Sequence, residues 1–319
     1  MIDPDLVLQA IDALPPMQDE GERNYLGASI IGEPCARKLW LQFHRYAEPE
    51  QFSARMLRLF FRGQREEGMF EMYLRETGFK VIHDCMQQAR WKQGFFSGAP
   101  DGVLEKDGVR YLAEYKTIND AGFKAMERGR IESLKPLHFA QIQVNGAEFK
   151  CDYGLYLVVN KNTDELFCDV IPIDLKKAQE YRDKAEWITM ADKPPEQIAT
   201  KPTDYRCKQC HVRDQCWGYV KPRVSCRNCT SSTKHPAQGT FGCDRIQKSN
   251  QVEERIRNNQ LDESGYCDHH SFNPFAMQDL YQWQPLEFYP DKRAVHYKKP
   301  DGTEVINGFD FVQSKDIDI

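Results

Sequence analysis

Residues 95–117 read FFSGAPDGVLEKDGVRYLAEYKT, and this stretch predicts the centre of the fold. Two short apolar segments, Val103-Leu104 and Val109–Tyr115, flank the triplet Lys106-Asp107-Gly108. An Asp-Gly pair between such segments is a strong signal for a tight turn between antiparallel strands. The stretch therefore predicts a β-hairpin.

Three polar side chains of this hairpin suit a metal-assisted reaction. Because side chains alternate along a strand, Glu114 and Lys116 share one face and Tyr115 points to the other. Asp101 stands at the entrance of the first strand, from which it can reach that face. Converging carboxylates make an oxygen-rich site for magnesium or manganese, and a neighbouring lysine can orient or help deprotonate a metal-bound water. The pattern favours a site that cuts phosphodiesters, and the alternative is an exposed turn followed by a charged strand.

Pro100-Asp101 followed by Glu114-Tyr115-Lys116 resembles the signature of the PD-(D/E)xK nuclease superfamily. This resemblance implies a restriction-endonuclease-like core. Outside the hairpin, the patterns predict strands at 79–82, 89–96, 153–160 and 165–173, and helices at 53–77, 123–130, 136–149 and 174–191. Such an order predicts an α/β fold with a mixed central sheet flanked by helices.

Length and composition limit the class of protein. The 319 residues have room for one large domain, or for a domain of about 200 residues with a smaller module. No apolar run reaches the 18 residues of a membrane span, and the N-terminus is acidic without a signal-peptide pattern. We expect a cytoplasmic protein, in the host cytoplasm if it is phage-encoded. The net charge is −5, but residues 201–236 carry eight Lys or Arg against two Asp, which is compatible with a local basic lane for DNA.

The long helix predicted at 53–77 adds two kinds of candidate residue. Glu67 can project toward the hairpin as a third metal-site acid. Arginines recur at helical spacing on another face, where they either contact a phosphate backbone or form a solvated basic stripe. The DNA-contact candidates are Arg58, Arg62 and Arg65.

Three cysteines form a C-x2-C-x5-C group, Cys207, Cys210 and Cys216, and Cys35 far upstream is the candidate for a fourth ligand. One upstream cysteine and a downstream triplet around a P-D…E-x-K core resemble the RecB-like iron–sulfur exonucleases, including the AddB nuclease domain and the CRISPR-associated RecB-like exonucleases. The resemblance implies a four-iron four-sulfur cluster that holds the two ends of the nuclease core together. The alternative is a structural zinc site that also uses His211.

The same resemblance implies roles for individual residues. Asp101 and Glu114 would bind the catalytic metal, Lys116 would be the catalytic lysine, and Gln141 would begin the family's Q-x-x-x-Y motif. Asn145 stands where that motif has tyrosine. The family also often has a histidine ligand followed three residues later by an acid, and this chain has Gln64 and Glu67.

A second cysteine group predicts a zinc-binding C-terminal module. Its ligand set would be Cys226, Cys229, Cys243 and Cys267, with His269 or His270 as a substitute. Few aliphatic residues occur in this segment, so a metal would supply folding free energy that its core cannot. We therefore expect a nuclease domain at 1–220 and a zinc-binding module with a tail at 221–319.

These observations predict a magnesium- or manganese-dependent DNA exonuclease that processes single- or double-stranded ends for recombination. A recombinase, a helicase or a single-strand-binding protein would suit it as a partner, and no membrane is expected. One alternative is a DNA-binding module that has lost catalysis but keeps its structural metals. Another is a redox sensor in which the cluster is the functional element.

Overall fold

The predicted hairpin forms the middle of a five-stranded sheet. In the computed structural model, which describes residues 3–14, 22–87, 89–244, 270–289, 294–307 and 317, β5 (Gly102–Lys106) pairs antiparallel with β6 (Val109–Ile118). The turn residues Asp107 and Gly108 have φ angles of +52° and +80°. Such left-handed angles are those of the tight hairpin turn that Asp-Gly favours, so the predicted hairpin is confirmed.

The central sheet is mixed, as predicted. Its strand order is β2-β5-β6-β7-β8, where β2 spans Lys80–His83, β7 spans Tyr153–Asn160 and β8 spans Leu166–Pro172. Strands β6 and β7 are parallel, whereas the other neighbouring pairs are antiparallel. A parallel pair needs a long crossover, and here it consists of three helices: α4 (Asp120–Met126), α5 (Ile131–Leu134) and α6 (Pro136–Glu148).

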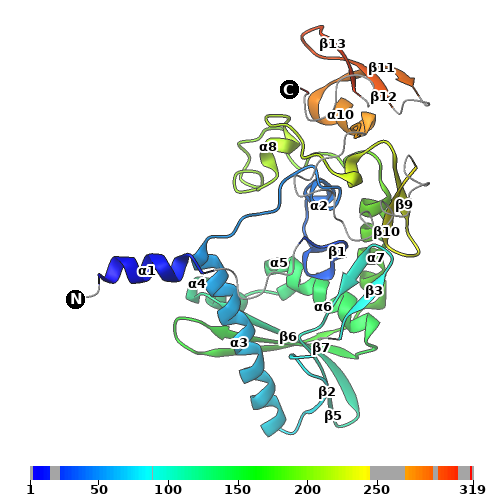
Figure 1. The fold of residues 1–319 in the computed structure, drawn as a ribbon. Coiled ribbons are helices and arrows are strands. Elements are labelled where there is room, and N and C mark those ends of the chain that lie inside the picture. Colours follow the sequence, from blue (N-terminus) through cyan, green and yellow to red (C-terminus); the bar gives the residue numbers. More distant parts are fainter. Residues whose placement is uncertain are drawn as a thin grey trace.

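Helices cover both faces of this sheet (Figure 1). Helix α3 (Ala54–Glu76) begins after the N-cap Ser53, whose side chain accepts a hydrogen bond from the Met56 backbone N–H. Its Phe70 packs against Tyr115 with ring centroids 5.3 Å apart. On the other face α6 contributes Ile142 to a buried cluster with Tyr156 and Val158 of β7. The two layers fix α3 and α6 relative to the strand that carries Glu114 and Lys116.

A third buried cluster joins segments that are far apart in the sequence. It includes Trp40 of α2 (Ala36–Phe43), Ile188 of α7 (Leu175–Met190) and Tyr297 of the C-terminal sheet. Trp40 is 1% exposed, and its indole N–H donates to the Ala191 carbonyl at 2.9 Å. Residues on both sides of position 220 therefore share one core.

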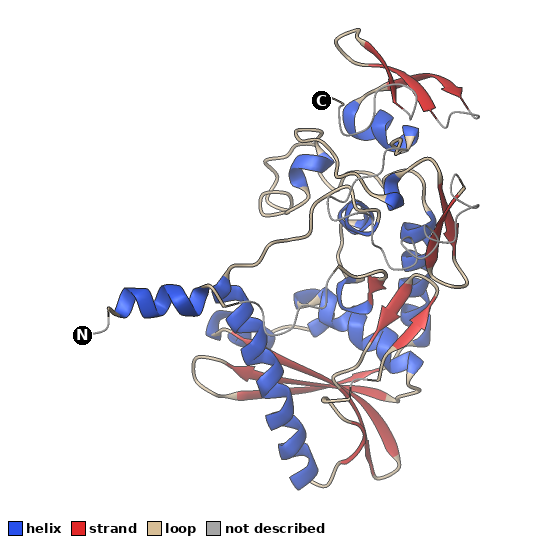
Figure 2. Cartoon of the chain, in the orientation of Figure 1, coloured by secondary structure: helices blue, strands red, loops and turns tan. Residues whose placement is uncertain are grey.

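The remaining elements are short (Figure 2). They are α1 Pro4–Asp12, β1 Leu26–Gly27, a 3₁₀ turn Ala28–Ile30, β3 Trp91–Gln93, β4 Phe96–Gly98, α8 Arg213–Cys216, a 3₁₀ turn Cys226–Asn228, β9 Ser232–His235, β10 Thr240–Cys243, α10 Pro274–Tyr281, β11 Gln284–Tyr289, β12 Ala294–Lys298 and β13 Glu304–Asn307. None of the helices within the described ranges is long and apolar enough to span a membrane.

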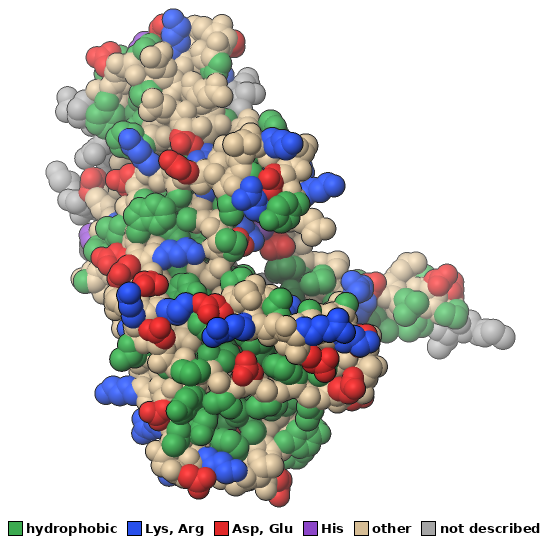
Figure 3. All heavy atoms as spheres, turned by 180° about the vertical axis from the view of Figure 1, so that it is seen from behind, with side chains coloured by type: hydrophobic (Ala, Val, Ile, Leu, Met, Phe, Trp, Pro, Cys, Tyr) green, Lys and Arg blue, Asp and Glu red, His purple; other side chains and the backbone are tan. Residues whose placement is uncertain are grey.

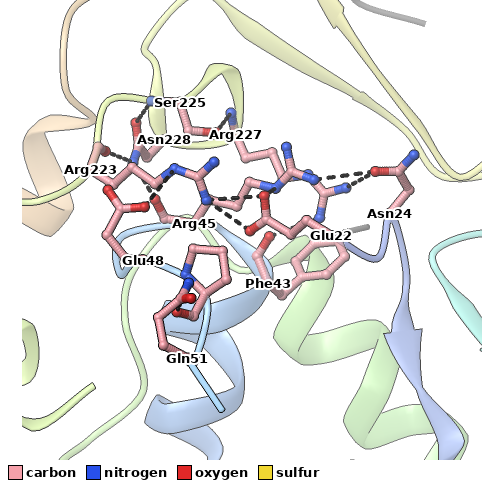
Figure 4. Close-up of polar contacts among 11 residues, drawn as sticks. Glu22, Asn24, Phe43, Arg45, Glu48, Gln51, Arg223, Ser225, Arg227 and Asn228 are labelled. Carbon is pink, nitrogen blue, oxygen red and sulfur yellow. Dashed lines mark hydrogen bonds and ion pairs between the residues drawn. The ribbon is translucent and has the colours of Figure 1, made fainter. Parts of the chain in front are cut away.

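A group of arginines ties the start of the chain to the segment after α8. Figure 4 shows Arg45, Arg223 and Arg227 around Glu22 and Asn24. The Arg227 guanidinium donates to the Phe43 carbonyl at 3.0 Å and to the Asn24 side chain at 3.2 Å. Burial, with the charge of Arg45 next in size, lowers the pKa of Arg227 to about 9. These contacts occupy the arginines with protein groups, which indicates a structural role.

Candidate active site

Four of the predicted site residues come together at one end of β5 and β6. The Lys116 ammonium lies 2.5 Å from a Glu114 carboxylate oxygen and 3.4 Å from Asp101 Oδ2. Asp101 Oδ2 also accepts the Tyr115 backbone N–H at 2.8 Å. Glu67 projects from α3 close enough for the charges of Asp101 and Lys116 to act on its pKa. The arrangement therefore assembles three carboxylates around one lysine.

Two carboxylates of this cluster have raised pKa values. Glu114 is 0% exposed, and burial raises its pKa to about 8 against the opposing charge of Lys116. Burial, reinforced by the negative charge of Asp101, raises the pKa of Glu67 to about 7. Burial alone would lower the pKa of Lys116, but the Asp101 and Glu114 carboxylates outweigh it and hold that pKa above its ordinary value. One ammonium thus faces an excess of buried carboxylate, as a cation-binding site requires.

The donor chemistry fits a divalent ion. Of the two oxygens of the buried Glu114 carboxylate, Oε1 faces the Lys116 ammonium and Oε2 has no hydrogen-bond partner. Hard oxygen ligands of this kind are those that Mg²⁺ and Mn²⁺ prefer. Within the described ranges no group of three or more His, Cys, Asp or Glu is already arranged to hold an ion. This finding covers the described cysteines as well as the carboxylate cluster, in which the Lys116 ammonium contacts both Asp101 and Glu114.

Magnesium is expected to raise the melting temperature more at pH 8 than at pH 6. The folded-state pKa values of about 8 for Glu114 and about 7 for Glu67 exceed the ordinary value of 4.5. At these two carboxyl groups the metal-free fold binds more protons than the unfolded chain, so their contribution to stability falls as pH rises from about 4.5 to 8. Bound Mg²⁺ favours the ionised carboxylates, so its stabilising effect grows over that range. At about 100 times its Kd, the ion should raise the melting temperature at pH 8 by about 5 °C.

Melting curves of Glu114→Gln, with Glu127→Gln on the exposed end of α4 as a control, check this prediction. Glu114→Gln should lose most of the magnesium shift and part of the pH dependence, whereas Glu127→Gln should keep both. An equal magnesium shift at pH 6 and pH 8 in the unmodified protein would contradict it.

Helix α6 places its polar residues in different roles. Asn145, which replaces the tyrosine of the family motif, is fully buried; it accepts the Trp91 indole N–H at 2.8 Å and donates to the Ala99 carbonyl at 3.1 Å. It therefore holds the segment that leads into Asp101. Gln141 is 9% exposed on the same helix.

His138, in the first turn of α6, lies 2.6 Å from the Tyr156 hydroxyl, measured from Nδ1. Sequence analysis assigned neither residue to the site. The available signal was the position of His138 three residues before Gln141, which puts the two on one face of the helix.

The three arginines predicted to contact DNA are exposed on α3, but two of them already have partners. Arg58 forms an ion pair with Asp12 of α1, and Arg62 donates to the Lys161 carbonyl at 3.4 Å. Figure 3 shows Lys and Arg interspersed with Asp and Glu on the face seen from behind, without one continuous basic area there. Contact of Arg58, Arg62 and Arg65 with DNA stays a prediction.

The four cysteines of the first group line one cavity of about 240 Å³. Burial raises the pKa of Cys207, Cys210 and Cys216, and the nearby Cys35 raises each of them further. His211 is not among the residues that line this cavity; its ring lies 3.0 Å from the Gln42 amide and 3.5 Å from Glu50. The structure thus brings Cys35 to the C-x2-C-x5-C segment, and it does not bring His211 there.

Part of the second cysteine group lies outside the described residues. Cys267 and His269 fall there, whereas Cys226 begins a 3₁₀ turn, Cys229 follows that turn, and Cys243 ends β10. The Ser231 backbone N–H donates to Cys229 Sγ at 3.4 Å. Ring nitrogen Nε2 of His270 lies 2.8 Å from Asn228 Oδ1 and 3.0 Å from the Ser225 carbonyl.

No model of a known protein family matches the chain, and no curated protein matches it. Among solved structures, the crystal structure of SSO0001 is 15% identical with a TM-score of 0.40, and the match covers 68% of this chain and 97% of that one. The alkaline exonuclease LHK-Exo from Laribacter hongkongensis is 17% identical with a TM-score of 0.39, over 52% of this chain and 87% of that one. The structure of LHK-Exo in complex with dAMP is 20% identical with a TM-score of 0.38, and the match covers 52% of this chain and 86% of that one. Likenesses this weak carry no argument, so function is inferred from the site itself.

Proposed function

We propose that the chain is a magnesium- or manganese-dependent DNA exonuclease with a restriction-endonuclease-like core. The observation that carries the proposal is the convergence of Glu67, Asp101 and Glu114 on the single ammonium of Lys116, in which the buried Oε2 of Glu114 has no hydrogen-bond partner. Burying more carboxylates than one ammonium can neutralise is costly unless a further cation compensates them. A metal-binding nuclease site accounts for three carboxylates around one lysine, whereas a structural ion pair needs only one carboxylate.

The residues would divide the work between binding the ion and stabilising charge. Glu67, Asp101 and Glu114 would hold the ion, which when bound supplies an activated water and neutralises the phosphate. Lys116 would donate hydrogen bonds to a phosphate oxygen or to the attacking water. Because its pKa lies above the ordinary value, the side chain is an ammonium at neutral pH and stabilises negative charge in the transition state.

Cleavage of end-labelled DNA tests the proposal. Anaerobically purified protein is incubated with single- and double-stranded substrates in magnesium, manganese or EDTA. Metal-dependent release of nucleotides from an end would support the exonuclease, and the labelled end would give its polarity. DNA binding without cleavage in any metal would instead support the catalytically inactive DNA-binding module, which the departures at Gln64 and Asn145 favour.

We also propose a four-iron four-sulfur cluster bound by Cys35, Cys207, Cys210 and Cys216. Their position around one cavity of about 240 Å³ supports it, because four thiolates are the ligands of such a cluster. The absence of His211 from the cavity lining argues against the zinc alternative that uses this histidine. The cluster would hold α2 against α8 and stabilise the core behind the active site.

For the C-terminal part we propose a structural zinc site formed by Cys226, Cys229, Cys243 and Cys267. The N–H to sulfur contact at Cys229 supports it, because such contacts orient thiolates toward a metal. Metal analysis should give about one zinc per chain, and Cys229→Ser should lose it. An unchanged zinc content in Cys229→Ser would contradict the proposed ligand set.

A further inference from the structure

We propose that His138, held by Tyr156, forms a phosphate subsite at the start of α6 and donates a hydrogen bond to a DNA phosphate oxygen beside the scissile bond. The inference rests on the proposed nuclease function.

The pair lies beside the catalytic strand. Tyr156 of β7 is the register partner of Glu114 on β6, and it is fully buried. Its hydroxyl reaches His138 Nδ1 across the space between the sheet and α6, at 2.6 Å. The charge of Lys116 also acts on both His138 and Tyr156. His138 therefore borders the same space as Glu114 and Lys116.

The hydrogen-bond geometry leaves Nε2 of His138 as the donor. The Tyr156 hydroxyl proton is buried, and the acceptor that the described residues offer it is His138 Nδ1. Since a buried hydroxyl proton needs an acceptor, Tyr156 donates to Nδ1 and the imidazole proton resides on Nε2. The described part of the chain supplies no hydrogen-bond partner for that Nε2–H, and the His138 ring is partly exposed.

The surroundings favour an anion at this point. The positive end of the α6 macrodipole lies at His138, because α6 begins at Pro136. Burial and the charges of Lys116 and Lys135 lower the pKa of His138, so the ring is a neutral donor. Two other polar side chains of α6 are already occupied: Gln143 donates to the Pro172 carbonyl at 3.0 Å, and Asn145 bonds Trp91 and Ala99.

A substrate-modification cycle tests the subsite. Cleavage in magnesium is measured for the unmodified protein and for His138→Ala, His138→Gln and Tyr156→Phe, with His296→Ala on the C-terminal sheet as the histidine control. Each protein is given DNA carrying a single uncharged methylphosphonate at successive positions around the scissile bond. The rates of each protein on the two substrates are expressed as a ratio. A smaller folded fraction lowers both rates equally, so it does not change that ratio.

At one position the methylphosphonate should slow the unmodified protein about 10- to 100-fold, the range for one hydrogen bond to a charged group. On unmodified DNA, the cleavage rate of His138→Ala should be lower than that of the unmodified protein by a similar factor. The methylphosphonate at that position should slow His138→Ala little further. His138→Gln, which keeps a neutral N–H donor, should recover part of the rate, and Tyr156→Phe should fall between. His296→Ala should behave as the unmodified protein.

The subsite would be overturned if His138→Ala and the unmodified protein were slowed equally at every position, since His138 would then be merely structural. If the unmodified protein cleaves nothing, the proposed function has failed. The same cycle on DNA affinity in calcium then decides the subsite separately. A coupling between His138 and one phosphate would support it, and the absence of coupling would reject it.

Discussion

Lys116→Ala is expected to lower the rate of DNA hydrolysis by roughly 10²- to 10⁴-fold, the loss that follows removal of a preorganised charge-stabilising group. The Lys116 ammonium lies 2.5 Å from Glu114 and 3.4 Å from Asp101, so it is in direct contact with two carboxylates of the site. Its removal takes away the cation that would face the phosphate. The measurement is single-turnover cleavage of end-labelled DNA with magnesium.

Lys124→Ala provides a matched control, because Lys124 forms an exposed ion pair with Asp120 within α4. Its cleavage rate should equal that of the unmodified protein. DNA affinity of Lys116→Ala should fall far less than its cleavage rate, which would separate loss of catalysis from loss of binding. Cleavage by Lys116→Ala at the original rate would show that this cluster is not the nuclease site.

The part of the site that sequence predicts best is the part encoded locally. The hairpin requires left-handed angles at two adjacent positions, and Asp107-Gly108 is a pair that tolerates them. Strand alternation then fixes Glu114 and Lys116 on one face. Periodicity alone does not decide whether Glu66 or Glu67 is the third acid of the site. That choice depends on the rotation of α3 about its axis, which the packing of Phe70 on Tyr115 sets.

Contacts between distant segments were beyond sequence reasoning. The bond between His138 and Tyr156 depends on how α6 packs on β7, which no spacing in the sequence states. The buried role of Asn145 likewise follows from the position of Trp91 in a separate small sheet. The prediction that Cys35 lies near the downstream cysteines rested on a family resemblance, because no residue near Cys35 in the sequence indicates this contact.

Cys35→Ser is expected to remove the iron–sulfur cluster and to lower the free energy of unfolding by roughly 3–5 kcal/mol, the scale for releasing a cross-link that closes a long loop. Cys35 precedes α2, and its proposed partners lie around α8. Without the cluster, α2 would be held by its core contacts alone, such as the Trp40 bond to Ala191. Iron and sulfide content, visible absorption and thermal melting of anaerobically purified protein provide the measurement.

Cys168→Ser is the matched control, because Cys168 is an exposed cysteine on β8, away from the cavity. It should keep iron content and melting temperature unchanged. Full iron content in Cys35→Ser would contradict the proposed fourth ligand, whereas zinc in place of iron in the unmodified protein would leave Cys35 as a ligand of a different metal.

Because the carboxylates and Lys116 are carried by β5, β6 and α3, DNA cleavage by Cys35→Ser at low temperature should survive the loss of the cluster. A parallel loss of cleavage and iron under conditions where the protein stays folded would assign the cluster a role in the reaction itself.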